Sequence, residues 1–230
     1  MWAVSRKVKK TDRGKAWNKK LTKTKPPHIE TRSKAKSFYI VCEGMNTEPE
    51  YFKSFPLGNA QVESFGLGQS KTKLVESVIE LLTSDESLKE KEVWVVFDMD
   101  INHEHANQQK EDYNRAIELA HKNNINVAYS NDTFELWFVL HYQYIDTPWN
   151  RGQFFERLSE LWGCNYSKDG KAKAFCERIY QMLLEDEHAN QEKAIYRAKK
   201  IHDEQAHLVF SDRNPCTTVF QLVQELNQYL

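Results

Sequence analysis

Five consecutive apolar residues that run into two aspartates decide the fold: Val93-Trp94-Val95-Val96-Phe97-Asp98-Met99-Asp100. Because the apolar residues are consecutive and do not alternate with polar ones, they predict a central strand that is covered on both faces. Side chains alternate along an extended segment, so Asp98 and Asp100 should point the same way, roughly 7 Å apart. Neighbouring carboxylates repel each other, and a divalent cation between them is a common remedy.

A second apolar stretch also ends in an acid. Phe38-Tyr39-Ile40-Val41-Cys42 is followed at once by Glu43 and Gly44. Open parallel sheets bind ligands at the carboxyl ends of their strands, so Glu43 should lie near Asp98 and Asp100. We therefore expect one shared, metal-holding acidic site. The alternative is that the two aspartates only open a turn, for which Asp is well suited.

Strand-like and helix-like segments alternate from residue 37 to residue 142, which predicts an α/β fold with a parallel sheet flanked by helices. The expected strands cover 38–42, 60–65, 93–97 and 126–129. Of the expected helices between them, three begin near 47, 70 and 133, and one carries Tyr113, Ala116, Ile117 and Ala120 on its apolar face. Helical patterns follow at 154–162, 171–185, 190–206 and 217–230. We expect three parts: a basic N-terminal arm at 1–36, an α/β core at 37–145, and a helical C-terminal part at 146–230 packed on the core.

The net charge of −1 hides a strong asymmetry along the chain. Residues 1–36 hold thirteen Lys or Arg and two acidic residues, a net charge of +11, and the remainder carries −12. A basic arm on an acidic body indicates contact with nucleic acid, and such binding should depend strongly on salt. The alternatives are an arm that only aids solubility, or one that packs on an acidic partner surface.

The four cysteines are scattered, without a Cys-x-x-Cys pair, so they predict neither a structural zinc site nor a disulfide framework. No apolar run approaches the roughly 20 residues of a membrane span, and the basic N-terminus lacks the apolar core of a secretory signal. We therefore expect a cytoplasmic protein without a membrane partner.

Several polar positions in the expected helices have a structural interpretation, a functional one or both. Thr47 and Glu50 have the spacing of a capping box at a helix start, which leaves Glu48 free to join Glu43. Glu135 and His141 interrupt a nearly apolar helix, where a buried acid needs a partner or a metal. For His141 a satisfied core histidine is the plainer interpretation.

Two further features are weak signals on their own. Gly66-x-Gly68 precedes a helix and could cradle a phosphate, although it lacks both a third glycine and the Gly-Lys-Ser of a nucleotide-binding loop. His103 and His105 follow the two aspartates and could reach a metal, although a solvated loop is the simpler interpretation.

Several motifs in order resemble the RloB family over about residues 37–230. They are Cys42-Glu43-Gly44-x-x-Thr47-Glu48-Pro49-x-Tyr51-Phe52, Phe97-Asp98-x-Asp100, Ser130-Asn131-x-x-Phe134-Glu135-Leu136-Trp137-x-x-Leu140-His141 and Asn214-Pro215-x-Thr217-Thr218-Val219. RloB proteins are similar to Toprim domains, the metal-binding module of primases, topoisomerases and OLD-type nucleases. Their genes lie in bacterial restriction and phage-defence loci, often beside an ATPase.

The resemblance implies roles for particular residues. The Toprim pattern of a Glu after the first strand and an Asp-x-Asp after a later one falls on Glu43, Asp98 and Asp100, as catalytic residues and ligands of Mg²⁺ or Mn²⁺. Glu48 and Glu135 fit family motifs, and we expect Glu135 to face the acidic site. We expect Lys168, in a loop between two C-terminal helices, to clamp the developing phosphate charge. Asn102 stands where some Toprim proteins carry a further acid, so the number of metals stays open.

The resulting expectation is a metal-dependent nuclease that cleaves DNA or RNA in anti-phage defence by abortive infection. The alternative is a partner subunit with little catalysis of its own, held by a defence ATPase until infection releases it. The expected partners also include further copies of the chain. A primase or topoisomerase is disfavoured, because the chain is short and nothing marks a second catalytic domain. The sequence does not distinguish DNA from RNA as substrate.

Overall fold

The strands predicted from the apolar runs assemble into one five-stranded sheet. The computed structural model describes residues 36–101 and 103–230, and the strands are β1 Lys36–Cys42, β2 Ala60–Gly66, β3 Glu92–Asp98, β4 Asn126–Asn131 and β5 Cys216–Thr217. Their order is β2-β1-β3-β4-β5; the first four are parallel, and β5 pairs antiparallel with β4. The α/β class is confirmed, and the parallel strands bring their carboxyl ends to one edge.

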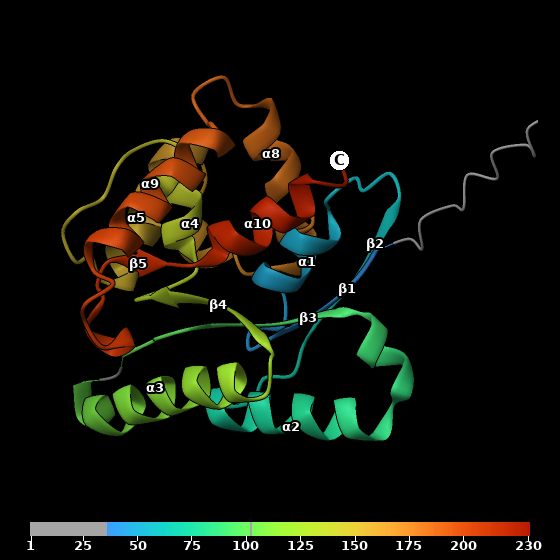
Figure 1. The fold of residues 1–230 in the computed structure, drawn as a ribbon. Helices are drawn as coiled ribbons and strands as arrows, with labels where there is room; N and C mark the ends of the chain where they lie inside the picture. The colour runs from blue at the N-terminus through green and yellow to red at the C-terminus, as the bar shows by residue number, and fades with distance from the viewer. Residues whose placement is uncertain (1–35, 102) are drawn as a thin grey trace, which may run out of the picture. The chain divides into compact units, whose positions relative to one another are not determined.

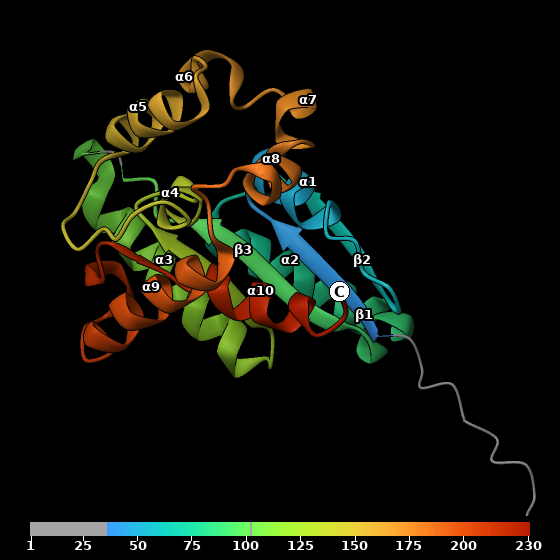
Figure 2. The same cartoon turned by 90° about the horizontal axis from the view of Figure 1, so that it is seen from above.

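Helices cover both faces of this sheet (Figure 1). The helices are α1 Thr47–Lys53, α2 Lys71–Ser84, α3 Ala106–Lys122, α4 Glu135–Leu140, α5 Arg151–Trp162, α6 Tyr166–Asp169, α7 Lys173–Cys176, α8 Ile179–Glu185, α9 Gln191–Glu204 and α10 Val219–Asn227, with 3₁₀ turns η3 Glu86–Glu90, η4 His103–His105 and η5 Phe210–Asp212. Helices α2 and α3 lie on one face, and the other helices lie on the opposite side. Figure 2 shows α5, α6 and α7 beyond the carboxyl ends of β1 and β3.

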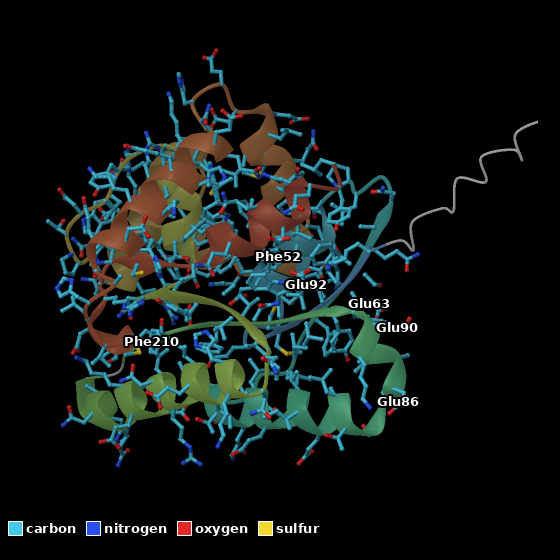
Figure 3. The ribbon with its side chains drawn as sticks, in the orientation of Figure 1. Phe52, Glu63, Glu86, Glu90, Glu92 and Phe210 are labelled. Atoms are coloured by element: carbon cyan, nitrogen blue, oxygen red, sulfur yellow. The ribbon has the colours of Figure 1, made fainter. Side chains whose placement is uncertain are left out.

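The alternation of side chains along β3 divides the core in two. Val93, Val95 and Phe97 pack with α2 and α3, whereas Trp94 and Val96 pack against the helices of the other face. In Figure 3 the labelled Phe52 lies on the latter side of the sheet, while Phe210 lies near α3. The prediction of a strand buried on both faces is therefore confirmed.

The C-terminal part is joined to the sheet itself. Its short strand β5 extends the sheet beside β4, and the Thr218 hydroxyl accepts the N–H of Tyr129 at 2.9 Å. The described residues belong to one compact unit, so the boundary expected at residue 145 falls inside that unit. The basic arm expected at 1–36 lies outside the described residues, apart from Lys36.

Three local predictions were wrong. Thr47 does not cap α1, since Asn46 holds the N-cap position and its side chain makes no capping bond, and Glu50 pairs with Lys53 at 2.9 Å. The expected helix at 171–185 is broken into α7 and α8, and the helix expected from residue 217 begins at Val219, because the residues before it form β5.

Gly66 has a packing role at the end of β2. A Cβ atom there would lie 2.0 Å from the carbonyl oxygen of Gly44, so the two loops approach more closely than any side chain allows. The N–H groups of Leu67 and Gly68 donate to the carbonyls of Cys42 and Glu43 at 3.0 Å each. These glycines therefore hold the loop that carries Glu43 and do not present free N–H groups to a phosphate.

We expect Gly66→Ala to lower the free energy of unfolding by about 2 kcal/mol, because backbone atoms must move to admit the methyl group. Gly58→Ala is the matched control, since a Cβ atom there meets nothing closer than 3.7 Å. Urea unfolding of both variants measures the difference. Equal stability of the two variants would contradict the packing role of Gly66.

Candidate active site at the carboxyl edge of the sheet

The acidic residues predicted from separate strands lie around one hollow of about 230 Å³. Glu43 follows β1 directly, Asp98 ends β3, and Asp100 stands two residues further on. The hollow is lined by Glu43, Gly44, Met45, Asn46, Thr47, Glu48, Asp98, Asp100, Arg151 and Lys171. The parallel pairing of β1 with β3 causes this meeting, because it aligns the ends of the two strands.

Glu43 is fixed through both its backbone and its side chain. Its N–H donates to the carbonyl of Val96 at 2.8 Å, and Oε1 lies 3.2 Å from Nζ of Lys71, the first residue of α2. The other oxygen, Oε2, is buried and has no hydrogen-bond partner among the described residues. Burial raises the pKa of Glu43, and the charge of Lys71 only partly offsets that effect.

Asp98 is the most strongly perturbed carboxylate of the cluster. Its Oδ2 accepts the N–H of Phe134 at 3.3 Å and lies 3.6 Å from Nη2 of Arg151. Burial, together with the negative charges of Glu48 and Glu43, raises the pKa of Asp98 well above its ordinary value. The pair with Arg151 does not fully offset these effects.

Asp100 sits at a left-handed backbone position, φ +46°, which turns the chain immediately after β3. Its Oδ1 lies 2.8 Å from Nη2 of Arg151, and the side chain is 51% exposed. Asp132, at the end of β4, accepts the N–H of Ile101 at 3.1 Å and thereby fixes the same turn. Burial raises the pKa of Asp132, and the nearby charge of Asp100 adds to that shift.

Glu48 brings a fourth carboxylate to the hollow from the first turn of α1. It lies directly over Gly44, where a Cβ atom would stand 2.2 Å from its Oε2. Burial raises the pKa of Glu48, and the positive charge of Lys171 opposes this shift. Gly44 is therefore required so that Glu48 can lie against the loop that carries Glu43.

Glu135 lies close to the hollow without lining it. It is fully buried at the start of α4 and accepts bonds from Lys171 at 2.5 Å, from Tyr166 at 2.9 Å and from Thr133. Burial alone would raise the pKa of Glu135, but Lys171 and the three hydrogen bonds bring it below its ordinary value. The structure thus makes Glu135 the residue that positions Lys171.

The structure does not bring Lys168 to the site, and Lys171 stands there instead. Lys168 is exposed on α6, where Asn165 caps the helix and Tyr166 takes the buried position. Lys171 follows the turn after α6 and lines the hollow. The sequence offered one signal for Lys171. A buried Glu135 requires a cation, and Lys171 lies only three residues after Lys168 in the same segment.

His141 lies away from the acidic site. It is 2% exposed, and its Nδ1 donates to the carbonyl of Trp137 at 2.9 Å. Burial lowers the pKa of His141 to about 4, so the ring is neutral at physiological pH. The plainer interpretation, a satisfied core histidine, is therefore the one that the structure supports. His105 is exposed and does not line the hollow either.

Three residues of this region were missed by the sequence analysis: Lys71, Asp132 and Arg151. Lys71 and Arg151 begin helices, where no local pattern distinguishes them from solvated basic residues. Asp132 follows β4 directly and so carries the same signal, an acid after a strand, as Glu43. Arg151 comes from the helical part, more than fifty residues after β3, so only the folded chain shows that it contacts Asp98 and Asp100.

The donor set suits Mg²⁺ or Mn²⁺, which prefer carboxylate oxygens, and Oε2 of Glu43 is buried without a partner. In the present arrangement, however, no three His, Cys, Asp or Glu residues within 36–101 and 103–230 converge as metal ligands. In this arrangement Arg151 bridges Asp98 and Asp100, and Lys71 pairs with Glu43. The carboxylates of Glu43, Asp98 and Asp100 suit a divalent ion chemically. Arg151 must move away from Asp98 and Asp100 for that ion to bind between them.

Fold and site together define an α/β protein with a carboxylate cluster at the carboxyl edge of a mostly parallel sheet. The family model described as RloB-like protein matches residues 38–226, so the chain belongs to the RloB-like family. A comparison with curated proteins gave no match. Within the part of the chain that the structure describes, no helix has the length and apolar character needed to cross a membrane.

We expect Asp98→Asn to raise the free energy of unfolding at pH 7, because it removes a buried negative charge beside Glu48 and Glu43. A carboxyl group whose pKa is raised in the folded state costs stability at pH values above that pKa, and asparagine removes this cost. Urea unfolding in EDTA measures the effect. Asp146→Asn, at an exposed position, is the control. A lower stability of Asp98→Asn than of the wild type would contradict the repulsion between Asp98 and its neighbours Glu43 and Glu48.

We expect His141 to make stability depend on pH between its unfolded pKa, about 6.5, and its folded pKa, about 4. In this window the unfolded chain binds a proton that the folded chain does not, so stability falls as the pH is lowered. The expected loss from pH 7 to pH 5 is about 2 kcal/mol more in the wild type than in His141→Gln. The exposed His207→Gln should retain the full slope. Urea unfolding at both pH values tests this, and identical slopes in the His141→Gln variant and the wild type would refute it.

Proposed function

We propose that the chain is a metal-dependent nuclease that acts as an effector of anti-phage defence in the cytoplasm, where phage nucleic acid is present. The observation that carries the proposal is the meeting of Glu43, Asp98 and Asp100 around one hollow at the carboxyl edge of the sheet. Membership in the RloB-like family supports the proposed role in defence. The basic arm supplies sequence-independent attraction for a polyanion, DNA or RNA.

Glu43, Asp98 and Asp100 are the residues that would hold Mg²⁺ or Mn²⁺. When bound, the metal would polarise a phosphodiester and lower the pKa of a coordinated water. Oε2 of Glu43 has no hydrogen-bond partner within 36–101 and 103–230, and the pKa of this carboxyl is raised, so Glu43 is also placed to accept a proton from water. Glu48 adds negative charge beside Glu43, which strengthens both roles. Glu135 acts indirectly, by fixing Lys171 at the rim.

We expect the purified chain with Mg²⁺ or Mn²⁺ to cut at least one member of a panel of duplex DNA, single-stranded DNA, single-stranded RNA and transfer RNA. Asp98→Ala and Glu43→Gln should each lower the rate about a hundredfold or more. Glu63→Gln is the control, because Glu63 lies on β2 in an ion pair with Lys91, away from the hollow. EDTA should abolish cutting. Wild-type rates in Asp98→Ala would rule out this site.

One observation favours a second candidate, a subunit that is silent until a partner acts on it. Every carboxylate of the hollow is close to a cation, Lys71, Arg151 or Lys171, so in the free chain these carboxylates are already engaged by side chains of the protein. An ATPase partner or further copies of the chain would then trigger activity. A native complex that cuts in a metal-dependent way, while the free chain does not, would favour this candidate over the autonomous nuclease.

A further inference from the structure

Arg151 occupies a defined position above the acidic site. It is the first residue of α5, and its backbone is fixed by a reciprocal capping box between Asn150 and Gln153. Its guanidinium reaches the carboxyl edge of the sheet, where Nη2 lies 2.8 Å from Asp100 and 3.6 Å from Asp98. The positive charge of Arg151 thus stands where a divalent cation held by the same two aspartates would stand.

The Nε donor of this guanidinium takes no part in the pairing with Asp98 and Asp100. Nε of Arg151 is buried and has no hydrogen-bond partner among the described residues. Oε2 of Glu43, which lines the same hollow, is also buried and unpartnered. Buried polar groups are normally hydrogen-bonded, and leaving one unpaired is costly, so an unpaired donor and an unpaired acceptor at one site indicate a missing ligand.

Another arginine of the same helix shows the contrast. Nε of Arg157 donates to Gln143 at 2.8 Å, and its Nη1 donates to Glu160 at 2.8 Å. Two of the three nitrogens of its guanidinium are therefore engaged by neighbouring side chains. Arg151, whose Nε and Nη nitrogens form a planar fork, is the one with spare capacity for two oxygens of a phosphate group.

We infer that Arg151 binds a backbone phosphate of the nucleic acid, and that it competes with the divalent cation for Asp98 and Asp100. The inference rests on the proposed function, since it assigns the substrate contact of that same site. Asp98 and Asp100 hold the guanidinium in the free chain. A cation bound by these aspartates displaces it toward the phosphate, where Nε and Nη together contact two oxygens. Metal binding and substrate binding are thereby coupled through one side chain.

The first test is the affinity for Mn²⁺ alone, measured by calorimetry on the full chain. Arg151→Gln removes the competing charge, so it should bind Mn²⁺ about threefold more tightly than the wild type. Arg151→Lys keeps the charge and should stay near the wild type. Arg157→Gln is the matched control on the same helix and should bind Mn²⁺ as the wild type does.

The second test is the affinity for short fluorescein-labelled DNA and RNA oligonucleotides in Ca²⁺, measured by anisotropy. Both Arg151→Gln and Arg151→Lys should bind the preferred oligonucleotide about tenfold more weakly, because neither side chain offers the Nε and Nη fork. The basic arm is identical in all variants, so its contribution cancels. Thermal unfolding confirms that each variant is folded.

Tighter Mn²⁺ binding together with weaker oligonucleotide binding in Arg151→Gln supports the inference, since a merely structural role would weaken both. Unchanged oligonucleotide affinity, or weaker Mn²⁺ binding, overturns it. A wild-type chain that binds oligonucleotide through Arg151 but neither cuts nor binds Mn²⁺ would overturn the proposed nuclease and the competition, and would leave only the phosphate contact.

Discussion

The parallel pairing of β1 with β3 is the constraint on which the acidic site depends. Cys42 lies opposite Val96, and the N–H of Glu43 donates to the carbonyl of Val96. This register places Glu43 beside the end of β3, where Asp98 stands. A shift by one residue would turn each side chain to the other face of the sheet, so Glu43 would lose Lys71 and the core would be exposed.

The cost of gathering carboxylates explains the arrangement of the surrounding helices. Buried negative charges must be compensated, and each cation comes from a different segment: Lys71 from α2, Arg151 from α5 and Lys171 from the turn after α6. The burial that raises the pKa values of Glu43, Glu48 and Asp98 outweighs this compensation. Packing of the C-terminal part against the sheet places Arg151 and Lys171 beside these carboxylates, whereas Lys71 comes from α2 within the α/β core.

Local patterns predicted the strands and the meeting of Glu43 with Asp98 and Asp100, because an apolar run identifies a buried strand and parallel strands share one edge. They did not predict β5, which consists of only two residues, Cys216 and Thr217, and forms only against β4. Local patterns also placed the C-terminal cation at Lys168 and not at Lys171. The reason is that tertiary contacts fix the turn after α6, which brings Lys171 to the hollow. The contacts of Arg151 depend on the placement of a whole helix, which no local pattern encodes.

The central claim is that Glu43, Asp98 and Asp100 together hold one divalent ion. Anomalous diffraction from crystals grown with Mn²⁺ tests it most directly, because the anomalous signal locates the ion without reference to activity. We expect one strong peak in the hollow, about 2.2 Å from carboxylate oxygens of Glu43 and Asp98, with Arg151 moved away from Asp100. A peak elsewhere, or no peak with Arg151 still bridging the two aspartates, would contradict it.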